Sequence, residues 1–177
     1  DAAREMGVAV SNPAGYSEQS VAELVVGQMI HLLRNVPAVE NRCRNGGTKD
    51  GLVGNELGSS VVGIVGVGAI GSRVATLCRA FGSTVIGYVP HPSERNRALL
   101  TYVSLEELLR ADIVTLHCPL TPETRGLIGR EQLALMKPSA YLINMARGPV
   151  VDAQAVADAL NQGKIAGAAI DVFEKEP

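Results

Sequence analysis

Short apolar runs alternate with amphipathic segments along most of this chain. The runs contain few polar residues, which is typical of strands that are covered on both faces of a parallel sheet. They predict six strands, at residues 61–65, 84–88, 101–103, 113–117, 140–144 and 166–172. Helical periodicity lies between them, at residues 70–81, from 104 onward, at 130–136 and from 152 to 161. This alternation predicts an α/β fold built on a doubly wound parallel sheet.

The first 55 residues follow a different pattern. Val8-Ala9-Val10 predicts a short strand, and a long helix is expected to begin near Ser17. Ser20 and Glu23 have the spacing of a capping box at the start of that helix. Residues 42–55 are polar, rich in glycine and without periodicity, so they predict a linker or crossover loop.

A glycine-rich turn follows the first of the six strands. Residues 66–71 read GVGAIG, a GxGxxG pattern between a strand that ends at Val65 and a predicted helix. Gly66 permits a tight turn, Gly68 lets the backbone approach a pyrophosphate, and Gly71 lets the helix pack close to the strand. Free N–H groups of this first turn, which includes Ala69 and Ile70, would face the phosphates. The context predicts a Rossmann dinucleotide-binding fold.

The end of the second predicted strand bears on the choice of dinucleotide. An acidic residue about twenty positions after the glycine motif would bind the adenosine ribose of NAD, and Val89 stands there instead. Valine neither accepts a hydrogen bond nor repels a phosphate, so NADP stays open beside NAD. His91, Arg95 and Arg97 follow. They are either solvated loop side chains or a site for the 2′-phosphate of NADP.

Composition and charge narrow the classes of function. The 177 residues are 46% hydrophobic and 19% charged, which is enough for one core and excludes a disordered chain. A net charge of −2 and 3% aromatic residues argue against nucleic-acid partners. The most apolar helical stretch, residues 21–33, is too short and too polar to span a membrane. Three scattered cysteines without a CxxC pair predict reduced thiols in the cytoplasm and no metal site.

Several separated motifs, in their order, resemble the D-isomer-specific 2-hydroxyacid dehydrogenase family, close to phosphoglycerate dehydrogenases. They are NPAG at 12–15, SVAE at 20–23, GNELG at 54–58, GVGAIG at 66–71, SLEELL at 104–109, HCPLTPET at 117–124, MKP at 136–138, NMARG at 144–148 and DVFEKEP at 171–177. The resemblance covers nearly the whole chain. It implies an oxidoreductase that transfers a hydride between a nicotinamide cofactor and a D-2-hydroxy acid, such as 3-phosphoglycerate, glycerate or lactate.

The resemblance also implies a domain division. Residues 56–177 correspond to the Rossmann cofactor domain. Residues 1–55 correspond to an interdomain crossover segment with the long helix and a remnant of the second, substrate-binding domain. The family's habit, together with the apolar stripe of the helix at 17–34, predicts a homodimer.

Roles for individual residues follow from the same resemblance. Arg147 matches the catalytic arginine, whose planar guanidinium holds the substrate carboxylate and polarises its carbonyl. Glu176 matches the glutamate that pairs with the catalytic histidine, and that histidine would lie a little under twenty residues further on. None of the histidines at 31, 91 and 117 matches it, so the 177 residues alone are expected to bind a dinucleotide without turnover. The remaining residues expected to line the cofactor groove are Cys118, Pro119, Met145, Ala146 and, by the nicotinamide, Asp171.

Two other readings compete with a 2-hydroxyacid dehydrogenase. The first is a non-catalytic NAD(H)-binding module that acts through protein partners, as the C-terminal-binding corepressors of this fold do. A histidine within about twenty residues beyond Pro177 would favour the enzyme, because the reaction needs a general base. The second, an amino-acid or alcohol dehydrogenase, is disfavoured because the segment from Arg147 to Glu176 matches neither class.

Overall fold

The computed structural model describes residues 2–11, 13 and 15–176. Six strands form one fully parallel sheet in the order β3-β2-β1-β4-β5-β6. Their bounds are β1 Val61–Val65, β2 Thr84–Tyr88, β3 Thr101–Tyr102, β4 Ile113–Leu116, β5 Tyr141–Asn144 and β6 Gly167–Ile170. The predicted doubly wound α/β sheet is confirmed. The strand order reverses between β1 and β4, and ligands of such sheets bind at the carboxyl ends of the strands beside that point.

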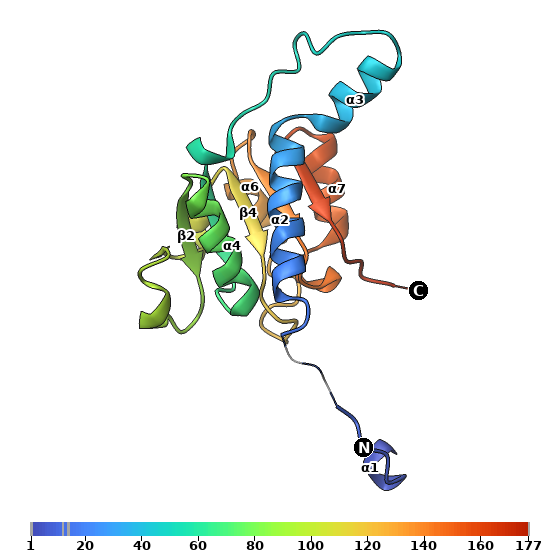
Figure 1. The fold of residues 1–177 in the computed structure, drawn as a ribbon, viewed down its shortest axis with the longest axis vertical. Helices are drawn as coiled ribbons and strands as arrows, with labels where there is room; N and C mark the ends of the chain where they lie inside the picture. The colour runs from blue at the N-terminus through green and yellow to red at the C-terminus, as the bar shows by residue number, and fades with distance from the viewer. Residues whose placement is uncertain (1, 12, 14, 177) are drawn as a thin grey trace.

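Helices cover both faces of the sheet (Figure 1). The α-helices are α1 Ala2–Glu5, α2 Glu18–Leu33, α3 Val36–Arg44, α4 Ala69–Ala80, α5 Leu105–Leu108, α6 Arg130–Leu135 and α7 Ala153–Asn161. Short 3-10 turns are η1 Leu57–Ser59, η2 Glu94–Asn96 and η3 Gly148–Val150. On one face, α2 and α4 pack Met29 and Val74 onto the sheet. On the other face, α5, α6 and α7 bury Leu108, Leu133 and Val156.

Side-chain caps mark the starts of the two helices that were expected from residue 104 and from residue 152. The Asp152 carboxylate accepts a hydrogen bond from the Ala155 N–H at 2.9 Å, at the first turn of α7. The Ser104 hydroxyl accepts one from the Glu107 N–H at 3.2 Å, at the first turn of α5. Both side chains satisfy N–H groups that have no partner inside the helix. These caps fix where the chain leaves β3 and where it enters the last crossover.

The capping box expected at Ser20 and Glu23 is wrong. Helix α2 begins earlier, at Glu18, so Ser20 lies inside it and its hydroxyl donates to the Ser17 carbonyl at 3.1 Å. The Glu23 carboxylate instead accepts a hydrogen bond from the side chain of Gln19. Helical spacing alone could not distinguish a capping pair from two residues one turn further in.

The strand expected at residues 8–10 is also wrong. Val8 and Val10 are 54% and 78% exposed, and the described residues there form no strand. Figure 1 shows this segment running away from the sheet toward α1. A strand requires a neighbouring strand for its hydrogen bonds, and none lies beside these residues. Within the loop that follows, and within the NPAG motif, Asn12 and Ala14 lie outside the described residues.

The linker expected at residues 42–55 begins later than predicted. Residues 42–44 complete α3, which was not foreseen, and only 45–55 form the expected loop. Asn35, with a φ of 53°, ends the helical path between α2 and α3. Within α3, the Glu40 carboxylate forms an ion pair at 2.6 Å with Arg44, one turn further on. Such a pair supports a short polar helix that has little apolar periodicity.

Most of the apolar stripe of helix α2 is buried against the sheet of the same chain. Ala22, Val25, Met29 and Leu33 are buried in the core shared with α4, β5 and β6. Leu24 is the large apolar residue of α2 that stays exposed. The apolar stripe of this helix is therefore mostly buried within the chain and does not by itself support a homodimer. The division into residues 1–55 and 56–177 remains a prediction.

Candidate functional site

The glycine turn joins β1 to α4 under tight steric constraints. Gly66 has a positive φ of 92°, and a Cβ there would lie 2.6 Å from the backbone N of Cys118. A Cβ on Gly71 would lie 2.1 Å from the Gly66 carbonyl oxygen. A Cβ on Gly68, in contrast, would meet no atom within 4 Å. The first and third glycines therefore hold strand and helix together, while the second presents open backbone at the start of α4.

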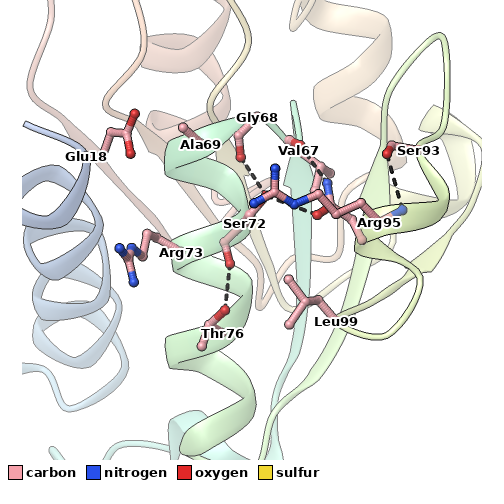
Figure 2. Close-up of a pocket in the computed structure, with 11 residues that line it drawn as sticks. Glu18, Val67, Gly68, Ala69, Ser72, Arg73, Thr76, Ser93, Arg95 and Leu99 are labelled. Carbon is pink, nitrogen blue, oxygen red and sulfur yellow. Dashed lines mark hydrogen bonds between the residues drawn. The ribbon is translucent and has the colours of Figure 1, made fainter. Parts of the chain in front are cut away.

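Two cavities lie along the carboxyl edge of the sheet, one on each side of this turn. The first, of about 730 Å³, follows α4 and η2, and Figure 2 shows the side chains that line it. The second, of about 430 Å³, lies toward β4 and β5. Ala69 lines the first cavity and Ile70 the second, so the first turn of α4 divides them. An elongated ligand with two ends could occupy both and cross the turn at Gly68.

The second cavity collects most of the residues that the sequence assigned to cofactor and substrate. Those that line it are Ile70, Cys118, Pro119, Met145, Ala146 and Arg147. They come from three separate crossovers, after β1, β4 and β5. Parallel strands bring their carboxyl ends to one edge, and this is why residues far apart in sequence meet there.

Arg147 stands at the start of η3, with its side chain exposed to the cavity. One guanidinium nitrogen, Nη1, donates to the Ala146 carbonyl at 2.6 Å, which leaves its other N–H groups free for a ligand. The turn that carries Arg147 is held by Asn144. The buried Asn144 amide donates to the Arg147 carbonyl at 3.0 Å and accepts from the Ala146 N–H at 3.1 Å.

Asn144 is a positioning residue that the sequence interpretation missed. It was counted as the end of a strand, although a polar side chain at the end of an otherwise apolar strand was the available signal. A buried amide needs hydrogen-bond partners, and here those partners are the backbone groups of the arginine turn. Gly148 completes the turn, because a Cβ there would lie 2.1 Å from the backbone of Phe173.

Outside the glycine turn, three assigned residues line neither cavity. Asp171 follows β6, is exposed, and its N–H donates to the Asn144 carbonyl at 3.1 Å. Glu176 is exposed, and its Oε1 accepts a hydrogen bond from the Phe173 N–H at 3.0 Å. Val89 is half-buried and packs against the core on the α2 and α4 face. The roles assigned to them remain predictions.

His117 lies half-buried at the end of β4 and lines the second cavity. Its Nε2 is 2.9 Å from the hydroxyl of the buried Thr115. Burial lowers the pKa of His117 to about 4, so the imidazole is neutral at pH 7. Burial raises the pKa of the neighbouring Cys118 thiol, with a smaller opposing effect from a backbone hydrogen bond. Cys118 therefore offers shape and backbone here, not a thiolate.

The titration of His117 should be visible in the stability of the fold. Its pKa in the folded state lies below the ordinary value of 6.5, so the unfolded chain binds the proton more tightly. Stability should therefore fall as the pH drops from 6.5 through 4, by about 1–3 kcal/mol from this group. Denaturant unfolding at pH 7 and pH 4 measures the loss, and His117→Asn should lose less than the wild type. Equal losses in both proteins would contradict the assignment.

The three basic residues after β2 occupy different environments. Arg95 lines the first cavity, beside Gly68 and Ala69. The Arg97 Nε binds the Glu94 carboxylate at 2.7 Å and lies outside that cavity. His91 is exposed and lines neither cavity. The tertiary structure therefore singles out one of three residues that the sequence could not rank.

The three cysteines of the chain form no disulfide among the described residues. The thiols of Cys43, Cys78 and Cys118 are free. Within residues 2–11, 13 and 15–176, no three histidine, cysteine or carboxylate side chains gather in a way that could hold a metal ion. In the same residues, no helix combines the length and apolar character needed to cross a bilayer.

Comparisons with known proteins agree with the fold and the glycine turn. The sequence model described as D-isomer specific 2-hydroxyacid dehydrogenase, NAD binding domain, matches residues 26–177. D-3-phosphoglycerate dehydrogenase of Methanocaldococcus jannaschii is 43% identical, over 100% of this chain and 35% of that protein. The NAD-complexed D-isomer specific 2-hydroxyacid dehydrogenase of Lactobacillus delbrueckii ssp. bulgaricus is 40% identical, with a TM-score of 0.88 over 97% of this chain and 53% of that one.

A second solved structure, a D-lactate dehydrogenase from Sporolactobacillus sp., is 46% identical, with a TM-score of 0.91 over 96% of this chain and 52% of that one. The chain spans between 35% and 56% of the length of the curated relatives it matches. The family match covers most of the chain and includes the glycine turn, β4, β5 and the arginine turn. This chain therefore belongs to the D-isomer-specific 2-hydroxyacid dehydrogenase family and contains the NAD-binding domain of that family.

Proposed function

We propose that the protein containing this chain is an NAD-dependent oxidoreductase that acts on a small D-2-hydroxy acid or the matching 2-oxo acid. The observation that carries this proposal is Arg147, whose guanidinium lines the same cavity as Ile70 from the first turn of α4. A cation with free donors beside a dinucleotide turn suits a substrate carboxylate and a carbonyl that gains negative charge.

The residues around the glycine turn fit the cofactor. Gly68 leaves open space in front of the helix start, where the N–H groups of α4 are available to a pyrophosphate. The cavity with Ser72 and Asn96 would take the adenosine half, and the cavity with Cys118, Pro119, Met145 and Ala146 would take the nicotinamide half. NAD supplies the hydride acceptor and, when reduced, the hydride. The chain's residues bind and orient the two reactants.

The remaining assigned residues act around the reacting carbon in this proposal. Arg147 holds the acid and polarises its C2 oxygen. Asp171 lies on the nicotinamide side, and Glu176 pairs with a histidine from another part of the protein, which moves the proton at that oxygen. A carboxylate beside an imidazole raises the pKa of the imidazole and fixes its orientation. Val89 follows the strand that would approach the adenosine ribose.

The names of the relatives support small 2-hydroxy and 2-oxo acids as the substrate class. They include a D-3-phosphoglycerate dehydrogenase, an aromatic 2-oxoacid reductase, a D-lactate dehydrogenase and a glyoxylate reductase. All of these are named as oxidoreductases, which favours an enzyme over the corepressor-like binding module.

Turnover by the complete protein tests the proposal. The protein is mixed with NADH and, separately, with pyruvate, phenylpyruvate, hydroxypyruvate phosphate and glyoxylate, and NADH oxidation is followed by absorbance. We expect sustained turnover with at least one of these acids. Binding of NADH without oxidation by any of them would favour the non-catalytic module instead.

We further propose a cytoplasmic homodimer without nucleic-acid or membrane partners. Support for the cytoplasmic location comes from the free thiols of Cys43, Cys78 and Cys118, which suit a reducing compartment.

Support for the dimer comes from the exposed apolar side chains Leu24 on α2, Val36 on α3 and Val53 on the following loop. Sedimentation of the complete protein at micromolar concentration should show a dimer. A monomer under those conditions would contradict this part of the proposal.

A further inference from the structure

The cavity of about 730 Å³ between α4 and η2 continues beyond the glycine turn along α4. It begins at Gly68 and follows the side of α4 past Ser72 as far as Thr76. We propose that its outer part is a phosphate subsite, in which Arg95 binds the 2′-phosphate of NADP(H), so that the protein accepts both dinucleotides. This inference rests on the proposed function, because it places the adenosine half of the cofactor in this cavity.

Arg95 brings an unpaired positive charge into the cavity. Among the described residues, no hydrogen bond or ion pair holds its guanidinium, and only its backbone N–H is bonded, to the Ser93 hydroxyl at 3.3 Å. Figure 2 shows the side chain reaching from η2 across the cavity toward the first turn of α4. Ser72, Thr76 and Ser93 line the same space, but the Ser72 hydroxyl donates to the Gly68 carbonyl at 2.7 Å and the Thr76 hydroxyl donates to the Ser72 carbonyl at 2.9 Å. The group suited to a phosphomonoester is therefore the Arg95 guanidinium.

The backbone that carries Arg95 is fastened to the glycine turn. The side chain of Asn96 is buried, and its Nδ2 donates to the Val67 carbonyl at 3.1 Å. Its Oδ1 lies 3.5 Å from the Ser72 hydroxyl on α4. These contacts hold η2 beside the place where the cofactor would cross the turn. The backbone of Arg95 is therefore held beside the proposed adenosine site, although the Arg95 side chain is exposed.

The nearby carboxylates leave this charge available. Glu94 is engaged by Arg97 at 2.7 Å. Glu18 is the carboxylate among the residues that line the cavity, and Figure 2 shows it on the α2 side, where Arg73 also points. Val89 does not line the cavity, and its place at the position of the usual repelling acid is a prediction from the sequence. The side of the cavity toward η2 therefore holds a free cation, while the carboxylate that lines the cavity lies on the α2 side.

The position along α4 distinguishes the 2′-phosphate from the pyrophosphate. A pyrophosphate would bind the N–H groups at residues 68–71, in front of the helix. Ser72 and Thr76 lie along the side of α4, turned toward η2 and away from the second cavity. NADP carries one phosphate besides its pyrophosphate, on the 2′-oxygen of the adenosine ribose. A phosphate site on this side of α4 would therefore bind the 2′-phosphate.

Titrations of NAD⁺ and NADP⁺ into the complete protein by calorimetry test the inference. We expect Arg95→Gln to weaken NADP⁺ at least about tenfold, or about 1.4 kcal/mol, and NAD⁺ less than about twofold. Arg97→Gln is the matched control, because it removes the same charge two residues away from an arginine that is already paired. It should leave both affinities within about twofold, and Arg95→Lys should restore part of the NADP⁺ affinity.

Val89→Asp provides an independent second arm. A carboxylate there should tighten NAD⁺ and weaken NADP⁺, and so shift their affinity ratio by at least about tenfold. An unchanged ratio in both Arg95→Gln and Val89→Asp would overturn the inference. Equal weakening of the two dinucleotides by Arg95→Gln would overturn it as well, because Arg95 would then act on the shared pyrophosphate. If the wild type bound neither dinucleotide, the proposed function itself would fail.

Discussion

Replacing Arg147 by alanine in the complete protein is expected to lower kcat/KM for the 2-oxo acid at least about a hundredfold. The variant loses a forked, charged hydrogen bond to the substrate carboxylate and the donor that polarises the reacting carbonyl. A change of this size corresponds to about 2.7 kcal/mol of transition-state stabilisation. Steady-state kinetics with NADH and the preferred acid measure it, and the NADH dissociation constant should change far less.

Two further variants separate the role of the guanidinium from general effects. Arg125→Ala removes an exposed arginine that lines neither cavity, so its kinetics should match the wild type. Asn144→Ala removes the side chain that holds the Arg147 turn, and should lower kcat/KM while Arg147 is still present. Near-normal kinetics of Arg147→Ala would remove this residue from the catalytic site and, with it, the main support for the proposed reaction.

Replacing Gly71 by alanine is expected to lower the stability of the fold far more than the same substitution at Gly68. Its Cβ would lie 2.1 Å from the Gly66 carbonyl oxygen, which belongs to the backbone and cannot rotate away. Helix α4 must then shift from β1, and we expect the free energy of unfolding to fall by about 1–3 kcal/mol or more. Thermal and denaturant unfolding measure this loss, and dinucleotide affinity should fall with it because the helix start moves.

Gly68→Ala is the matched control in the same turn. Gly68 has a φ of −82°, and its new Cβ would meet no atom within 4 Å, so unfolding should change by less than about 1 kcal/mol. Its dinucleotide affinity should nevertheless fall, because the methyl group fills the open space in front of the helix. Equal stability of the Gly71 and Gly68 variants would show that the turn can relax. Unchanged affinity in Gly68→Ala would show that no pyrophosphate approaches there.

Much of the fold could be read from local patterns. The apolar runs at residues 61–65 and 84–88 coincide with β1 and β2, because strands covered on both faces need continuous apolar sequence. The helices expected from residues 104 and 152 begin there, since the Ser104 and Asp152 side chains cap them through bonds within four residues. Where the pattern needed a distant partner, it misled. Residues 8–10 have the composition of a strand, but the part of the chain that the structure describes places no neighbouring strand beside them.

In the candidate site, too, the features set by local sequence could be predicted and those that depend on distant contacts could not. The glycine turn could be predicted from local sequence, because a tight turn, open backbone and close packing each require glycine at a fixed spacing, and Gly66, Gly68 and Gly71 occupy those places. The folded arrangement, in contrast, was needed to show which basic residue after β2 faces the cavity. Arg95 and Arg97 are equivalent in sequence, yet Glu94 pairs with one and leaves the other free. It also decided that the apolar stripe of α2 covers its own sheet, because burial depends on which surfaces the whole fold brings together.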